Sequence, residues 1–268
     1  MKNIKVIISL ILVSLIVNQV AFAQKLISAK DLKAKKGVVI IDTRSADDYA
    51  KTHIKGSINI DSKTLEKPGT IKGILKSPEQ VAAIFGENGV SKDAEIVLYC
   101  KTGVNAGRVY WVLTYLGAKN VSILDGQLGG WMAVRGPITN AKTTLTKTTF
   151  TPSVNKSLFA NKAYVSSKLK GASTIIIDAR KAEDFKAGNI PGSINIPKEE
   201  IVTSKYNFKD KASLQALFAK AGVSSNKEII VSCESGSRAG TMFFVLTGIL
   251  NYPNVKVYDG SYNEWKGL

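Results

Sequence analysis

The stretch IIDTRSADDYAKTHIKGSINI, residues 40–60, decides the fold because it recurs without a gap as IIDARKAEDFKAGNIPGSINI at residues 176–196. The pairing continues along the chain: EIVLYC (95–100) matches EIIVSC (228–233), and ILDGQLGGW (123–131) matches VYDGSYNEW (257–265). The spacing is too long for a solenoid, so each copy is expected to be a complete domain with its own core.

Short β-branched runs alternate with helical patterns in both copies. Runs at 38–41, 95–99 and 121–124, and at 174–177, 228–231 and 255–258, are typical of buried strands. Ser77, Pro78 and Gln80 form a capping box that predicts a helix over 78–85, and Asp210 is the equivalent cap in the second copy. We therefore predict an α/β fold of two tandem domains, each with a mostly parallel sheet and helices on both faces.

The N-terminus has the pattern of a secretory signal peptide. Lys2 and Lys5 precede an apolar run that is too short for the roughly 20 residues of a membrane span, and Ala21-Phe22-Ala23 is a cleavage site. We expect an exported protein, periplasmic or secreted, without a membrane anchor after processing. The expected boundaries are signal peptide 1–23, first domain 24–138, Thr/Lys-rich linker 139–157 and second domain 158–268.

Composition narrows the possible chemistry. The 268 residues are 44% hydrophobic and carry 37 Lys and Arg against 21 Asp and Glu, a net charge of +16 that favours anionic ligands. One histidine, His53, and two cysteines are too few for zinc fingers, zinc proteases or iron–sulfur clusters, so no metal is expected. The basic–aromatic interleaving of a nucleic-acid platform is absent from the sequence, so we expect no nucleic-acid partner.

Each cysteine, Cys100 or Cys233, ends a predicted strand and precedes a glycine-bearing turn and a helix. A helix N-terminus presents backbone N–H groups and a positive dipole, which favour the reactive thiolate. We predict that both are nucleophiles and that their loops bind substrate, with these candidate residues: Lys101, Thr102, Gly103, Val104 and Asn105 in the first, and Glu234, Ser235, Gly236, Ser237 and Arg238 in the second. Two alternatives are a pair of inert core thiols and a Cys100–Cys233 disulfide.

Both halves resemble rhodanese domains, and the whole resembles a tandem-domain sulfurtransferase of the thiosulfate and 3-mercaptopyruvate type. The resemblance rests on the two cysteine loops, on the Asp-x-Arg and Gly-Ser motifs of the repeat, and on the segments 125–131 and 259–265. It implies that cysteine takes sulfane sulfur from a small anionic donor as a persulfide and passes it to cyanide or a thiol, without a cofactor. Among less favoured functions are a persulfide carrier that does not turn over and a cysteine phosphatase or arsenate reductase. The latter use C-x5-R, whereas position six is Ala106 or Ala239 here.

The active cysteine is not fixed by sequence. Two-domain members of the family usually keep it in the second domain, which favours Cys233, whereas the CxxGVxA form of the first loop favours Cys100. Lys101 and Arg108 would attract a dianion to the first loop, while Glu234 would repel one from the second and Arg238 would attract it. Arg44 and Arg180, expected to pair with Asp42 and Asp178, are further candidates for substrate contact. His53 is expected to be structural, since its counterpart is Asn189, and an exposed thiolate outside the cytoplasm implies a reductant partner.

Overall fold

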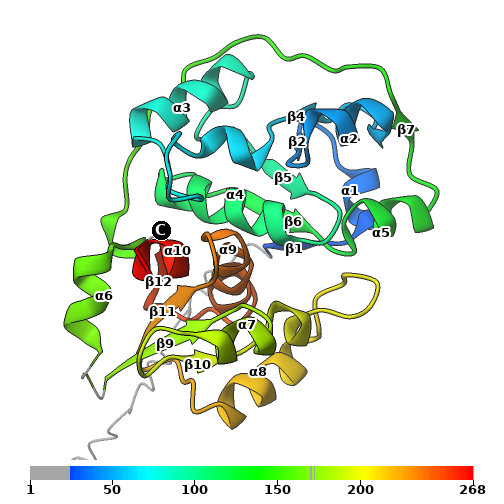
Figure 1. Cartoon of the computed structure of the whole chain (residues 1–268). Helices are drawn as coiled ribbons and strands as arrows, with labels where there is room; N and C mark the ends of the chain where they lie inside the picture. The colour runs from blue at the N-terminus through cyan, green and yellow to red at the C-terminus, as the bar shows by residue number, and fades with distance from the viewer. Residues whose placement is uncertain (1–24, 170, 172, 268) are drawn as a thin grey trace, which may run out of the picture.

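The computed structural model describes residues 25–268 except Lys170, Ala172 and Leu268, so the predicted signal peptide lies outside the described residues. Two α/β domains lie side by side, and a long connecting segment passes over the first of them (Figure 1). None of the helices within the described residues is long and apolar enough to cross a bilayer.

The first domain is built on a five-stranded sheet of order β1-β6-β5-β2-β4, in which every neighbouring pair is parallel. Its elements are β1 (Leu26–Ile27), α1 (Ala29–Ala34), β2 (Val39–Asp42), α2 (Ala46–Lys51), β3 (His53–Ile54), β4 (Ile58–Asn59), η1 (Ser62–Leu65), α3 (Pro78–Glu87), β5 (Ile96–Tyr99), α4 (Val104–Tyr115), β6 (Val121–Leu124), α5 (Gln127–Ala133) and β7 (Ile138–Thr139).

The second domain repeats this order with β8-β12-β11-β9-β10, again parallel throughout. Its elements are η2 (Lys156–Leu158), β8 (Phe159–Ala160), α6 (Lys162–Lys168), β9 (Thr174–Asp178), α7 (Ala182–Ala187), β10 (Ile194–Asn195), η3 (Lys198–Ile201), α8 (Lys211–Lys220), β11 (Glu228–Ser232), α9 (Ser237–Phe244), the π-helical turn η4 (Val245–Ile249), β12 (Val255–Tyr258) and α10 (Ser261–Trp265). The tandem α/β architecture predicted from the repeat is confirmed.

Apolar side chains cover both faces of each sheet. Helices α1 and α5 pack on one face of the first sheet, and α6 and α10 do so on the second. On the remaining faces α3 and α4 of the first domain join α8 and α9 of the second in one continuous hydrophobic core. The two domains therefore share a core through α4 and α9, which face each other at the centre of the molecule (Figure 1).

Local sequence explains where the helices begin. Ser77 and Gln80 form the capping box of α3, and Asp210 caps α8, as predicted. Helices α4 and α9 begin two residues earlier than the apolar pattern predicts. Gly103 and Gly236, with φ of +85° and +83°, are their N-caps. Only glycine adopts this left-handed geometry at little cost, so each chain turns directly from the cysteine loop into a helix.

The expected linker is bonded to the first domain along much of its length. Its start is the strand β7, which pairs antiparallel with β3, and two residues are too few to give a strand pattern in the sequence. Further on, Thr148 N–H donates to Gly86 O and Ser153 N–H donates to Leu116 O. His53 holds this segment as well: its buried ring stacks on Tyr49 and places Nε2 3.1 Å from Ala141 O, a structural contact.

Candidate active site

Both cysteines lie at the carboxyl end of a central strand, where parallel sheets place their ligands. Cys100 follows β5 and Cys233 follows β11, and each is joined by a short loop to a left-handed glycine that caps the next helix. Both thiols are buried and free, so the disulfide alternative is not the arrangement in the structure.

The Cys100 thiol is held by a backbone donor and faces a cavity. Gly103 N–H donates to Cys100 Sγ over 3.1 Å, and Cys100 N–H donates to Gln127 Oε1 over 2.9 Å. An N–H group aimed at sulfur stabilises a negative charge there. The cavity, of about 290 Å³, is lined by Arg44, Ser45, Asp48, Asp61, Lys63, Cys100, Lys101, Thr102 and Asn105.

Charges of both signs surround this cavity. Lys63, Lys101 and Arg44 carry three positive charges against the carboxylates of Asp48 and Asp61. Arg44 is largely neutralised by Asp42 beneath it, so the two lysines are the cations available to an incoming anion. These two lysines line the same cavity as Cys100, where a small anion would meet the thiol.

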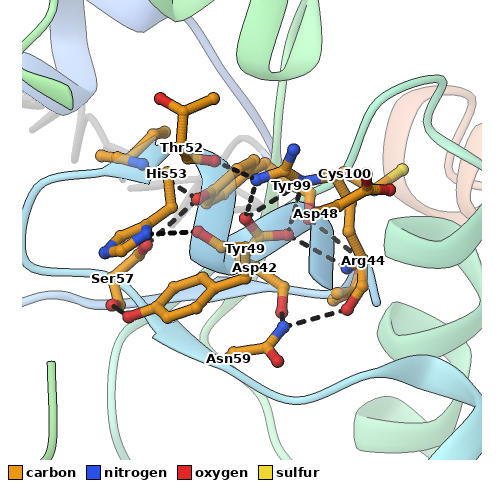
Figure 2. Close-up of polar contacts among 12 residues, drawn as sticks. Asp42, Arg44, Asp48, Tyr49, Thr52, His53, Ser57, Asn59, Tyr99 and Cys100 are labelled. Atoms are coloured by element: carbon orange, nitrogen blue, oxygen red, sulfur yellow. Dashed lines mark hydrogen bonds and ion pairs between the residues drawn. The ribbon is translucent and has the colours of Figure 1, made fainter. Parts of the chain in front are cut away.

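Arg44 lines the cavity, and polar contacts hold its side chain in place (Figure 2). Its guanidinium is bidentate on Asp42, with Nε–Oδ1 at 2.9 Å and Nη2–Oδ2 at 2.5 Å, and it donates to Thr52 O. Asn59 Nδ2 donates to the backbone oxygens of Asp42 and Arg44. Burial opposes the charge of Arg44, but the hydrogen bond and the charge of Asp42 outweigh it and raise the pKa of the guanidinium.

The second domain repeats this frame. Arg180 is bidentate on Asp178 and donates to Gly188 O, and Asn195 takes the place of Asn59. Arg180 also stacks 4.0 Å from the Tyr262 ring centroid and lies 3.5 Å from Glu234 Oε2. Burial disfavours its charge, and Asp178 followed by Glu234 overcomes this, so the pKa of Arg180 is raised.

The Cys233 loop differs in what covers it. Gly73 of the first domain packs on Ser235 so closely that a side chain at Gly73 would overlap the Ser235 carbonyl. Glu234 pairs with Arg180 and with Lys266, at 3.5 and 3.2 Å, so its charge is neutralised at the loop. Ser237 and the half-buried Arg238 begin α9 beside Cys233. Glu234 is expected from the sequence to repel a dianion, and the two cations beside it weaken that repulsion.

Arg108 lies away from the Cys100 cavity to which the sequence assigned it. Its Nη2 donates to Gly73 O and pairs with Asp259 Oδ1, both at 2.6 Å, and its side chain is 1% exposed. It therefore faces the second domain, because its position in the first turns of α4 points it across the domain interface. Of the other first-loop candidates, Lys101, Thr102 and Asn105 do line the cavity, whereas Gly103 and Val104 form the helix start behind them.

Comparisons with known proteins agree with this architecture. The family model described as a rhodanese-like domain matches residues 26–134 and again residues 161–268. The chain belongs to the rhodanese family. It is a tandem-domain sulfurtransferase of the rhodanese type.

Individual relatives of this tandem rhodanese span most of its length. The 3-mercaptopyruvate sulfurtransferase of Escherichia coli K12 is 32% identical over 237 residues, which is 84% of each chain. The thiosulfate sulfurtransferase of Azotobacter vinelandii is 28% identical over 253 residues, 89% of this chain and 93% of that one. The crystal structure of SseA, a 3-mercaptopyruvate sulfotransferase from Escherichia coli, superposes with a TM-score of 0.82 at 31% identity and covers 89% of this chain and 98% of that one.

Sequence reasoning missed several residues of the rhodanese sites. Ser45, Asp48, Asp61 and Lys63 line the Cys100 cavity but belong to no cysteine motif. All four follow β2 or β4, so the rule that ligands collect beyond the carboxyl ends of parallel strands would have pointed to them. Gln127 left no such signal, since its contact with Cys100 N–H depends on how the turn after β6 folds back.

Proposed function

We propose that the protein transfers sulfane sulfur from a small anionic donor, thiosulfate first, to a thiophilic acceptor, and that Cys100 carries the sulfur. The observation that supports this is the Cys100 thiol, which accepts the Gly103 N–H and opens into a cavity lined by Lys63 and Lys101. The loop of Cys233, by contrast, is overlaid by Gly73.

The transfer needs two displacements at sulfur. The Cys100 thiolate attacks the outer sulfur of thiosulfate, the S–S bond breaks, and sulfite leaves with the bonding electron pair, so that a persulfide remains. An acceptor such as cyanide then attacks the outer sulfur of the persulfide and leaves as thiocyanate, which returns the thiolate. Lys63 and Lys101 attract the dianion, and the Gly103 N–H stabilises the thiolate that begins and ends the cycle, while the persulfide between the two steps carries its charge on the outer sulfur.

Thiocyanate production by the mature protein, beside Cys100→Ser and Cys233→Ser, tests the assignment. We expect Cys100→Ser to reduce turnover to background and Cys233→Ser to leave most of it, because the Cys100 thiol faces a cavity lined by lysines whereas Gly73 lies over the Cys233 loop. Mass spectrometry after thiosulfate treatment should show one added sulfur on the peptide that contains Cys100. Loss of turnover in Cys233→Ser alone would reassign the site to the second domain.

Three further results would require the proposed function to be revised. A persulfide that forms once and is never turned over, whatever acceptor is supplied, would make the protein a sulfur carrier. Turnover with 3-mercaptopyruvate but not with thiosulfate would identify 3-mercaptopyruvate as the donor. That substrate gives up its sulfur and leaves as pyruvate. No adduct with any sulfane donor would contradict sulfur transfer altogether.

We also propose that the protein acts outside the cytoplasm after cleavage behind Ala23, as the leader sequence predicts. A reducing partner would then keep the two thiols from over-oxidation. The mass of the protein isolated from the periplasm or medium tests this, with Gln24 as the expected first residue. Recovery of the uncleaved chain from the cytoplasm would contradict it.

A further inference from the structure

The two helices that start at the cysteine loops touch each other through backbone atoms. A Cβ added to Gly107 in α4 would lie 2.5 Å from Thr241 Cα in α9, and one added to Gly240 would lie 2.7 Å from Arg108 Cα. The two glycines occupy the same place in the repeat, seven positions after their cysteines. This close contact places the residue after each glycine, Arg108 or Thr241, beside the cysteine loop of the other domain.

Thr241 is the residue that reaches the Cys100 loop. It is fully buried, and its Oγ1 donates to Gly103 O over 3.3 Å. Gly103 is also the residue whose N–H donates to Cys100 Sγ, and as the N-cap of α4 it has no side chain to fix it. A hydroxyl from the second domain thus contacts the loop residue whose N–H donates to the sulfur of the first.

Arg108 makes the reciprocal contact with the Cys233 loop. Its Nη1 lies 2.6 Å from the position of a Cβ on Gly236, the N-cap of α9. Asp259 anchors the guanidinium from the side, while Nε and Nη1 have no hydrogen-bond partner among the described residues. Unpartnered N–H donors on a buried guanidinium are costly, and here the guanidinium packs its positive charge against the second loop.

We propose that Thr241 and Arg108 are cross-domain positioning residues: Thr241 sets the geometry of the Cys100 loop, and Arg108 sets that of the Cys233 loop. This rests on the proposed function only in taking the Cys100 loop as the reactive site. It gives the backbone contact at the starts of α4 and α9 a purpose, since each domain adds a contact to a loop whose own domain already holds it, through the N–H of Gly107 on Gly103 O and that of Gly240 on Gly236 O.

The test is alkylation of each cysteine by iodoacetamide in the folded full-length protein, followed separately on the two cysteine peptides by mass spectrometry from pH 5 to pH 9. Thr241→Val removes the hydroxyl with little change in volume, and Thr241→Ser restores it. Thr247→Val is the matched control, because its Oγ1 donates to Phe243 O in the same helix, away from both loops.

For Thr241→Val we expect the pH midpoint of Cys100 alkylation to rise and its rate at pH 7 to fall by about twofold to tenfold, the range expected for one lost hydrogen bond. Cys233 should be unchanged, Thr241→Ser should behave as the unaltered protein, and Thr247→Val should affect neither cysteine. Arg108→Lys should change the pH midpoint of Cys233 alkylation and spare Cys100.

An unchanged Cys100 profile in Thr241→Val would overturn the proposal, and so would equal changes at both cysteines, which indicate general loosening. If Arg108→Lys does not fold, the Thr241 series decides alone. Alkylation needs no sulfur donor, so a protein with this crosswise pattern and no sulfur transfer would contradict the proposed function while leaving the positioning role intact.

Discussion

Gln127 and Ser261 hold the two cysteines through the same pair of hydrogen bonds. Each accepts the N–H of its cysteine, at 2.9 and 3.2 Å, and each donates to the carbonyl three residues before itself, that of Leu124 or Tyr258. Both adopt positive φ, 55° and 51°, an uncommon conformation for residues with a side chain. This conformation turns the side chains of Gln127 and Ser261 back towards the N–H groups of Cys100 and Cys233.

Replacing Gln127 by Met should therefore destabilise the protein by about 1–3 kcal/mol, since Cys100 N–H and Leu124 O are left buried without partners. Urea unfolding measures the change in free energy. Gln215→Met, on the exposed side of α8, is the control and should stay within about 0.5 kcal/mol of the unaltered protein. Equal stability of both variants would mean that the two buried groups find other partners.

At the scale of elements, the crossing of α4 and α9 leaves no space for a side chain at Gly107. A Cβ there would meet both Cα and Oγ1 of Thr241, and backbone cannot move aside as the end of a flexible side chain can. We expect Gly107→Ala to cost about 1–3 kcal/mol of stability through overpacking.

Gly129 is the matched control for that substitution. It lies inside α5 and has open space around its Cα, so Gly129→Ala should stabilise the protein by about 0.5–1 kcal/mol from helix propensity alone. Thermal unfolding of the two variants compares them directly. A stabilising Gly107→Ala would show that the helices separate easily at their crossing.

Sequence predicted the elements better than their assembly. The repeat gave the three central strands of each five-stranded sheet to within one residue, whereas the two-residue strands, such as β1 and β4, were not predicted. The caps at Ser77 and Asp210 were correct because capping is a local interaction. Arg108 was assigned to the wrong loop because its partner, Asp259, is 151 positions away, and nothing local encodes that contact. The same holds for the packed linker, whose bonds go to groups distant in sequence.

At the scale of the whole molecule, each domain has an aspartate that accepts a backbone N–H from a loop of the other domain, and the two aspartates are equivalent in the repeat. Asp259 accepts the N–H of Leu75, and Asp125 accepts that of Phe208, both at 2.9 Å. Glu66 lies close to the first of these contacts and accepts the N–H of Gly73. Burial raises the pKa of Glu66, and the opposing effects of Arg108 and of the Gly73 N–H are smaller.

This half-buried carboxyl should make the domain interface sensitive to pH. A raised pKa means that the folded protein favours protonated Glu66, so this contribution to stability is present at acidic pH and is lost as pH rises past the group's ordinary value. Glu66→Gln removes the ionisable group and with it this loss of stability. The free energy of unfolding of Glu66→Gln, relative to that of the unaltered protein, should therefore increase between pH 4 and pH 8, as measured by urea unfolding at each pH.

Glu79 provides a control of opposite sign. Its own backbone N–H and then the Ser77 hydroxyl lower its pKa, so its contribution is present at neutral pH and is lost on acidification. The free energy of unfolding of Glu79→Gln, relative to that of the unaltered protein, should therefore decrease as pH rises. Parallel trends in the two variants would show that the pH response does not come from these carboxyls.

The π-helical turn η4 accounts for a one-residue difference in length between the two copies of the repeat. Asp259 follows Cys233 by one residue more than Asp125 follows Cys100, and a π-turn takes up one extra residue without ending the helix. It lies beyond the crossing at Gly240, so the surplus residue shifts neither the cysteine loop before it nor the strand after it. An insertion or deletion after the duplication was thus absorbed within one turn of helix, and the two sites kept the same design while their side chains changed.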